Sequence, residues 1–108
     1  GEGLLTPVEL LLAAIAGCSS VDVDAGTSRR STPEVFEVLA SALKQTEDGA
    51  VRLDDVEVDF DVRFPADEQG AKAQKMVDRL IQLSEQKDCT VSRTVEHPTT
   101  VSFHNLAD

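Results

Sequence analysis

The longest apolar run of the chain extends from Leu10 to Cys18 and contains no polar side chain. Helix-start residues precede it. Thr6 is a favourable N-cap, Pro7 suits the first helical position, and Glu9 completes a T-x-x-E capping box. A surface helix would show a polar stripe, and this run has none. We therefore expect a helix that is buried on every side and that carries one of the two cysteines of the chain.

Two other interpretations of this run fit less well. It is much shorter than the ~20 apolar residues that a membrane-spanning helix needs. The sequence Ala14-Ile15-Ala16 imitates a signal-peptide cleavage site, but the residues before the run include Glu2 and no Lys or Arg. A purely structural role for Cys18 remains open, because free cysteines are often buried for packing alone. We expect the helix to continue to about Arg30, and Pro33 to stop it.

The clearest strand pattern follows in the middle of the chain. Apolar and polar residues alternate from Val56 to Phe64, and the polar side is mostly acidic, so one face should meet water. The preceding segment, Val35–Gln45, also has apolar residues at helical spacing. However, Asp48-Gly49 between two apolar segments is a strong hairpin signal. We therefore interpret Val35–Gln45 as a strand that pairs with the second one.

Three more elements are expected before the end of the chain. Apolar residues at helical spacing predict an amphipathic helix over roughly Ala71–Gln86 that lies on the sheet. A short helix should begin just after Cys89, and Pro98 should end it. The alternation of Val101 and Phe103 predicts a final strand over Thr99–Asn105.

Composition narrows the function classes. The chain has 108 residues, a formal net charge of −10, four Phe and neither Trp nor Tyr. Such a charge disfavours nucleic acid or an anionic membrane as a partner. Two cysteines far apart form neither a disulfide framework nor a zinc site, and they suit a reducing cytoplasm. His97 and His104 have no ligand-spaced partner, so we expect no metal and no cofactor.

Two motifs resemble those of a known family. Residues 7–19, PVELLLAAIAGCS, resemble the P-x-E-L-L-x-A-A-x-A-x-C motif of the OsmC/Ohr family (osmotically inducible protein C and organic hydroperoxide resistance). Residues 88–93, DCTVSR, resemble its second cysteine motif. The resemblance covers nearly the whole chain. It implies an α+β, OsmC-like fold in which residues 1–108 form one domain without the usual N-terminal strands. The expected parts are an antiparallel sheet, a buried central cysteine helix and a second amphipathic helix, assembled as an intertwined dimer.

The family resemblance also implies a chemistry. It makes Cys18 the thiol that attacks a hydroperoxide, organic rather than hydrogen peroxide because the surroundings are apolar. Cys89 then resolves the resulting sulfenic acid, and a cellular dithiol reduces the disulfide. The homodimer has independent support, because a helix that is apolar on all faces needs more cover than one small chain provides. The alternatives are a non-catalytic OsmC-like protein that binds a small ligand and a redox sensor.

The local surroundings of the two thiols differ along the sequence. Family members normally supply an arginine that stabilises the thiolate, and no cation stands near Cys18 along the chain. Cys89, at the start of a short helix and near Lys87 and Arg93, has the more favourable local surroundings. In many members a glutamate directly follows the motif proline. Here Val8 stands at that place, and we assign Glu9, one residue later, to the capping box.

Overall fold

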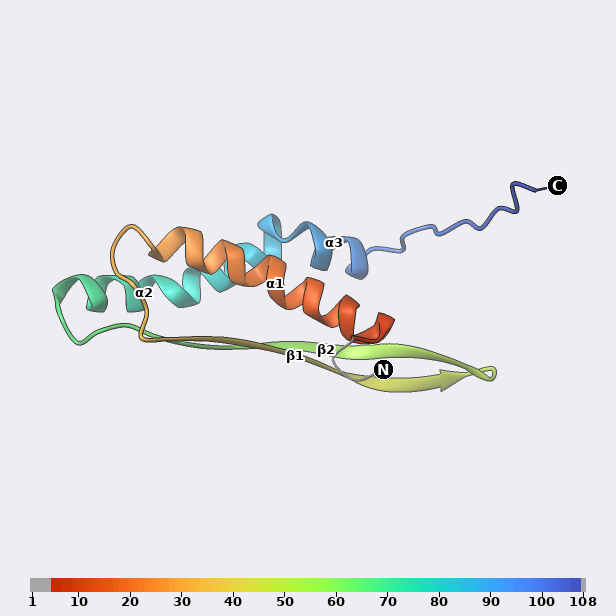
Figure 1. Ribbon diagram of the computed structural model, residues 1–108, viewed down its shortest axis with the longest axis horizontal. Coiled ribbons are helices and arrows are strands. Elements are labelled where there is room, and N and C mark those ends of the chain that lie inside the picture. Colours follow the sequence, from red (N-terminus) through yellow and green to blue (C-terminus); the bar gives the residue numbers. More distant parts are fainter. Residues whose placement is uncertain (1–4, 108) are drawn as a thin grey trace.

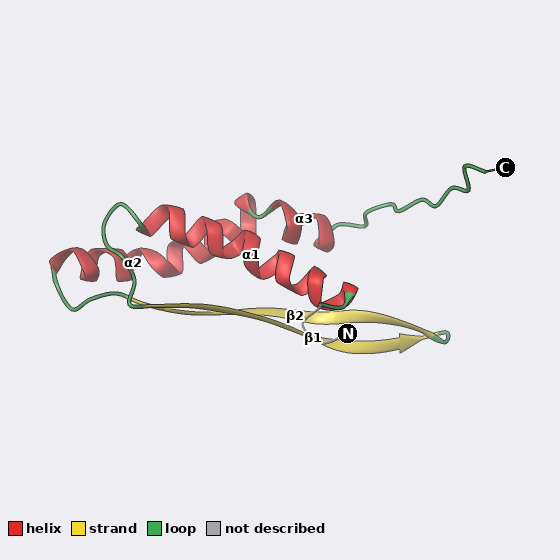
Figure 2. Cartoon of the chain, in the orientation of Figure 1, coloured by secondary structure: helices red, strands yellow, loops and turns green. Residues whose placement is uncertain are grey.

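The structure is a computed structural model that describes residues 5–107, and of Asp88 the backbone alone. Three helices and one short π-helical turn lie over one face of a two-stranded antiparallel sheet (Figures 1 and 2), which confirms the α+β class. The body is elongated, 62 × 32 × 28 Å. The elements in chain order are α1 (Pro7–Thr27), β1 (Val35–Glu47), β2 (Ala50–Arg63), α2 (Glu68–Leu83), η1 (Ser84–Asp88) and α3 (Thr90–Glu96).

Helix α1 begins as the sequence predicts. The Thr6 hydroxyl accepts the backbone N–H of Glu9 at 3.2 Å, and the Glu9 carboxylate accepts the backbone N–H of Thr6 at 3.1 Å. This reciprocal pair satisfies two of the N–H groups that a helix start leaves without partners. The helix ends at Thr27, rather than near Arg30, where the Thr27 hydroxyl donates to the carbonyl of Val23 at 2.9 Å.

Within one chain, fewer faces of α1 are buried than the sequence predicted. Only one stripe is buried, formed by Ile15, Ser19, Val23 and Thr27. Apolar side chains on its other faces stay in solvent, with Val21 as the extreme case at 65% exposure. The expectation of burial on every side is therefore wrong for the single chain. The sheet and α2 together cover one side of a helix and cannot enclose it.

The hairpin agrees with the interpretation of residues 35–45 as a strand. Strand β1 pairs with β2 in antiparallel register, with Val38 opposite Phe60. Asp48 and Gly49 connect the strands with φ of 50° and 80°. Positive φ at both central residues is the geometry of a tight hairpin turn that matches the twist of the strands. Both strands extend further toward this turn than the alternation alone indicated.

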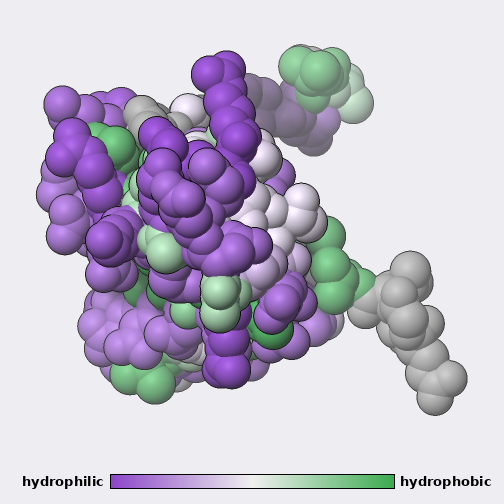
Figure 3. Space-filling model, turned by 90° about the vertical axis from the view of Figure 1, so that its left-hand side faces the viewer, coloured by the Kyte–Doolittle hydropathy of each residue, from purple (hydrophilic) through white to green (hydrophobic). Residues whose placement is uncertain are grey.

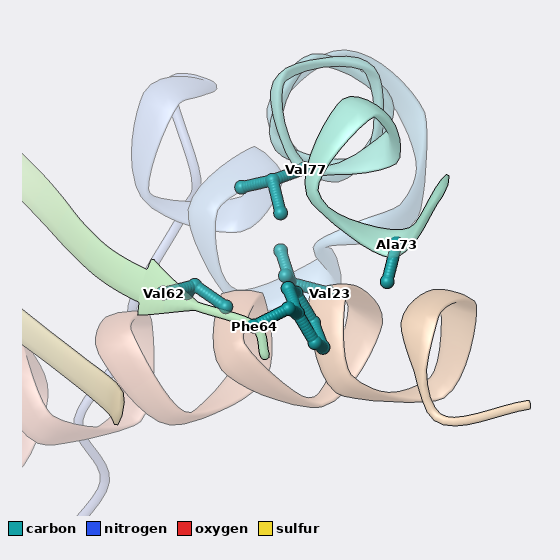
Figure 4. Packing of buried hydrophobic residues seen from close by; sticks show 5 residues of the cluster. All are labelled: Val23, Val62, Phe64, Ala73 and Val77. Atoms are coloured by element: carbon teal, nitrogen blue, oxygen red, sulfur yellow. The ribbon is translucent and has the colours of Figure 1, made fainter. Parts of the chain in front are cut away.

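The core lies where α1 and α2 meet the base of the hairpin (Figure 4). Helix α2, predicted as Ala71–Gln86, begins earlier, at the N-cap Asp67, and gives way to η1 at Ser84. The side-chain amide of Gln74 connects α2 to the end of β2. Its nitrogen donates to the Val62 carbonyl at 2.9 Å, and its oxygen accepts the backbone N–H of Phe64 at 3.1 Å. The buried core residues are Val23, Val62, Phe64, Ala73 and Val77.

The predicted final strand over Thr99–Asn105 is wrong. These residues form no strand and lead away from the body (Figure 1), and Phe103 is 92% exposed. A strand requires a neighbour for its backbone N–H and C=O groups, and among the described residues only β1 and β2 pair. The face of the molecule seen in Figure 3 is mostly hydrophilic with small apolar patches, as the net charge of −10 leads one to expect.

Candidate functional site

The fold brings the two cysteines together from distant parts of the chain. Cys18 lies on α1, and Cys89 is the N-cap of α3. Both are free thiols, and each shifts the pKa of the other. Ser19, the neighbour of Cys18, donates its hydroxyl to the sulfur of Cys89 at 3.7 Å. The juxtaposition that the sequence motifs implied is therefore present.

Cys89 is fully buried and surrounded by hydrogen-bonding groups. Its Sγ accepts the backbone N–H of Ser92 at 3.4 Å and lies 3.2 Å from the Ser92 hydroxyl oxygen. Burial raises the pKa of this thiol, but the hydrogen bonds from Ser92, Cys18 and Ser19 outweigh burial and leave the pKa below its ordinary value. Cys89 can therefore ionise more readily than an ordinary thiol.

Cys18 is partly exposed, and its pKa shifts the other way. The interaction with the Cys89 side chain is the main cause that raises the pKa of Cys18 above its ordinary value. Burial and the negative charges of Cys89 and Asp22 add to it, while the backbone of Val91 acts in the opposite sense. The pair is thus unequal: the accessible sulfur holds its proton, and the buried one releases it more easily.

These pKa directions agree with the expectation that Cys89 has the more favourable surroundings, but the cause is different. Hydrogen bonds from Ser92 and Ser19 stabilise its thiolate, rather than the charges of Lys87 and Arg93. The three-residue spacing of Cys89 and Ser92 is that of an N-cap and its bonding partner, so this signal was readable. The contact of Ser19 has no signal in the sequence, because it depends on how α1 packs against α3.

A hydrogen-bonded link holds the segment that leads into Cys89. The Ser84 hydroxyl donates to a carboxylate oxygen of Asp22 at 2.6 Å, and the Ser84 carbonyl accepts the backbone N–H of Cys89 at 2.9 Å. Ser84 is 1% exposed, so both bonds are shielded from water. Asp22 and Ser84 were not singled out from the sequence.

A pocket of about 210 Å³ opens next to the buried thiol of Cys89, although neither cysteine is itself a lining residue. Its polar lining includes Ser19 and Ser92, the residues that contact the sulfur of Cys89. Glu85 of η1 and Glu96 of α3 are its charged lining residues. The pocket therefore combines an apolar wall, two hydroxyls next to a thiol and two carboxylates. The apolar wall consists of Ile15, Val56, Val58, Phe60, Ile81 and Val95.

Two further searches of the structure gave negative results. In the part of the chain that the structure describes, no three His, Cys, Asp or Glu residues gather in a way that could hold a metal ion. Within residues 5–107, no helix is both long and apolar enough to cross a membrane.

The fold and the cysteine pair define a small α+β protein with a two-thiol site. The family model described as OsmC-like protein matches residues 1–104. The chain therefore belongs to the OsmC-like protein family, as its two motifs indicated.

Solved structures share the fold. A hypothetical protein from Aquifex aeolicus VF5 superimposes with a TM-score of 0.69 at 24% identity, over 92% of this chain and 70% of that one. An OsmC-like protein of unknown function from Vibrio cholerae gives a TM-score of 0.67 at 18% identity, over 92% of this chain and 64% of that one. The match extends over about two thirds of the length of these relatives. No curated protein matches the chain.

Proposed function

We propose that this protein is a thiol-dependent peroxidase that reduces organic hydroperoxides with Cys18 and Cys89. The observation that carries the proposal is the meeting of two free thiols, one partly exposed and one buried, with an apolar pocket next to the serines that contact the buried sulfur. The family, which includes peroxidases, supports the same chemistry. The free thiols also suit a reducing compartment, the cytoplasm.

In this mechanism Cys18 attacks, because its sulfur is partly exposed whereas Cys89 is fully buried. The Cys18 thiolate attacks one peroxide oxygen, the O–O bond breaks, and the alkoxide leaves as the alcohol after taking up a proton. The sulfur becomes a sulfenic acid. The Cys89 thiolate then attacks that sulfur, hydroxide leaves as water, and a disulfide forms. A dithiol restores both thiols by two exchange steps.

The lowered pKa of Cys89 suits the resolving step, since the thiolate is the attacking species in disulfide formation. The raised pKa of Cys18 means that the first step needs an additional positive charge near this sulfur. Within the described residues, the charges that act on Cys18 come from Cys89 and Asp22, and both are negative.

We further propose that the active form is a homodimer. Helix α1 carries solvent-exposed apolar residues about two turns before Cys18: Leu10 is 54% and Leu11 41% exposed. Exposed apolar side chains concentrated on one helix are typical of an interface. A second chain would cover these residues and reach the vicinity of Cys18. Light scattering after gel filtration should give twice the mass of one chain, and a monomer at micromolar concentration would contradict this.

The experiment follows the consumption of cumene hydroperoxide with dithiothreitol as the reductant. Cys18→Ser should abolish turnover, and Cys89→Ser should abolish turnover while leaving a single oxidation at Cys18. Ser20→Ala is the matched control, because its hydroxyl donates within α1 to the Gly17 carbonyl at 2.8 Å and does not contact either thiol. Turnover that survives Cys18→Ser would reject the proposal.

The pocket also favours a second candidate function, the binding of a small apolar ligand without catalysis. Six apolar side chains and two hydroxyls are a typical lining for such a site. This function predicts that a small apolar ligand binds in the pocket while cumene hydroperoxide is not consumed. Consumption that depends on Cys18 would exclude it as the sole function.

A further inference from the structure

We propose that Glu85 and Glu96 make the pocket select uncharged or cationic hydroperoxides and reject those that carry a carboxylate, such as fatty-acid hydroperoxides. This inference rests on the proposed function, because it assigns the substrate class of the same site. It is carried by the arrangement of charge around the pocket.

The pocket has a polar end next to the sulfur of Cys89. Ser19 and Ser92 line it and contact the sulfur of Cys89. Their hydroxyls are suited to hydrogen-bond a peroxide oxygen. A hydroperoxide would therefore place its O–O group at these serines and its carbon skeleton along the wall formed by Val58, Phe60 and Ile81.

The charged residues of the lining are of one sign. Glu85 lies on η1 and Glu96 ends α3, so the two carboxylates come from separate elements next to the pocket. Both are exposed to solvent. The lining includes no Lys or Arg among the described residues. A ligand carboxylate would approach two like charges without a cation to pair with it.

The charge of the whole chain acts in the same direction. The formal net charge of −10 on 108 residues lowers the local concentration of anions and raises that of cations near the surface. Since Glu85 and Glu96 are exposed, salt should screen their effect. The predicted preference should therefore weaken as the ionic strength rises.

The first test measures binding without turnover. Octan-1-ol, octanoate and octylammonium have the same chain length and differ in the charge of the head group. Each is titrated into the reduced protein at low salt while the methyl NMR signals of Ile15, Ile81 and Val95 are followed. Octanoate should bind about fivefold or more weakly than octan-1-ol, and octylammonium at least as tightly. Equal affinity of octanoate, or shifts that spare these methyl groups, would overturn the inference.

Variants then identify the source of the selection. Glu85→Gln and Glu96→Gln together should bring octanoate to within about twofold of octan-1-ol, because they remove the two charges and keep the size of the side chains. Glu37→Gln is the matched control: Glu37 is exposed, lies opposite Asp61 in the strand register, and is not part of the pocket lining. If the difference in affinity between octanoate and octan-1-ol is unchanged in the double variant, or if Glu37→Gln reduces it equally, then Glu85 and Glu96 are not the cause of the selection and the inference is rejected.

The second test uses turnover and separates the two proposals. The ratio of kcat/KM for cumene hydroperoxide to that for a carboxylate-bearing aryl hydroperoxide should exceed about five and fall toward one in the double variant. Turnover of both substrates at equal efficiency would overturn the inference and leave the peroxidase function standing. Charge-ordered binding without turnover of either peroxide would instead support the pocket and reject the peroxidase function.

Discussion

Ser84 donates a hydrogen bond of 2.6 Å to Asp22, and this bond joins the start of η1 to α1 one turn beyond Cys18. The carbonyl of Ser84 accepts the backbone N–H of Cys89. The distance between the two sulfurs therefore depends on a buried serine that is not itself reactive. The same aspartate also adds negative charge near Cys18.

Asp22→Asn should make Cys18 more reactive. The amide oxygen can still accept the Ser84 hydroxyl, but the negative charge is lost, so the pKa of Cys18 should fall. A lower pKa gives more thiolate at neutral pH. Because Asp22 is the smallest of the causes, we expect a two- to threefold faster alkylation of Cys18 by iodoacetamide at about pH 7. Asp24→Asn, with an exposed side chain, is the control. An equal rate in both variants would contradict the role of Asp22.

Ser84→Ala should destabilise the fold. It removes the donor to Asp22 and leaves a partly buried carboxylate without that bond, which should cost about 1–2 kcal/mol of the free energy of unfolding. Urea unfolding of the reduced protein measures this. Ser28→Ala, at the exposed C-cap of α1, should change the free energy of unfolding much less. Disulfide formation should also be slower in Ser84→Ala, since η1 sets the position of Cys89.

Ser92→Ala should slow the resolving step. The Ser92 hydroxyl helps hold the pKa of Cys89 below its ordinary value, and its removal should raise that pKa. Less Cys89 is then ionised at any pH below the new value, so the disulfide forms more slowly and the difference from the wild type shrinks as the pH rises. Stopped-flow measurement of disulfide formation over a pH series tests this. A constant ratio of rates at all pH values would point to a structural effect.

Two glycines should differ sharply in their tolerance of a side chain. A Cβ on Gly70 would collide with the backbone carbonyl of Pro65, whereas nothing lies near a Cβ on Gly17. Gly70→Ala should therefore cost about 1–3 kcal/mol, because backbone must shift at the start of α2. Gly17→Ala should leave the stability unchanged or raise it by about 0.5–1 kcal/mol, as it replaces a glycine inside a helix. Thermal unfolding of both variants gives the comparison.

Local signals predicted most of the elements. The start of α1 was readable because Thr6 and Glu9 lie within one helical turn and need no other part of the chain. The hairpin was readable because Asp48-Gly49 suits positive φ, and this turn signal outweighed the helical spacing in residues 35–45. The motifs around Cys18 and Cys89 identified the family and the thiol pair.

The remaining features depend on distant contacts. The alternation of Val101 and Phe103 describes a strand-like surface, but it cannot supply the neighbour that a strand requires. Similarly, the apolar run of α1 gives no indication of which stripe one chain can bury. The link between Asp22 and Ser84 and the charges around the pocket arise from packing between separate elements.

The most direct test of the account is to oxidise the reduced protein with one equivalent of cumene hydroperoxide and locate the product by mass spectrometry. The account predicts one disulfide between Cys18 and Cys89, with the loss of two hydrogen atoms, and a sulfenic acid at Cys18 in Cys89→Ser. It predicts no oxidation in Cys18→Ser. Two intact thiols in the wild type after this treatment, or oxidation of Cys89 at the wild-type rate in Cys18→Ser, would contradict it.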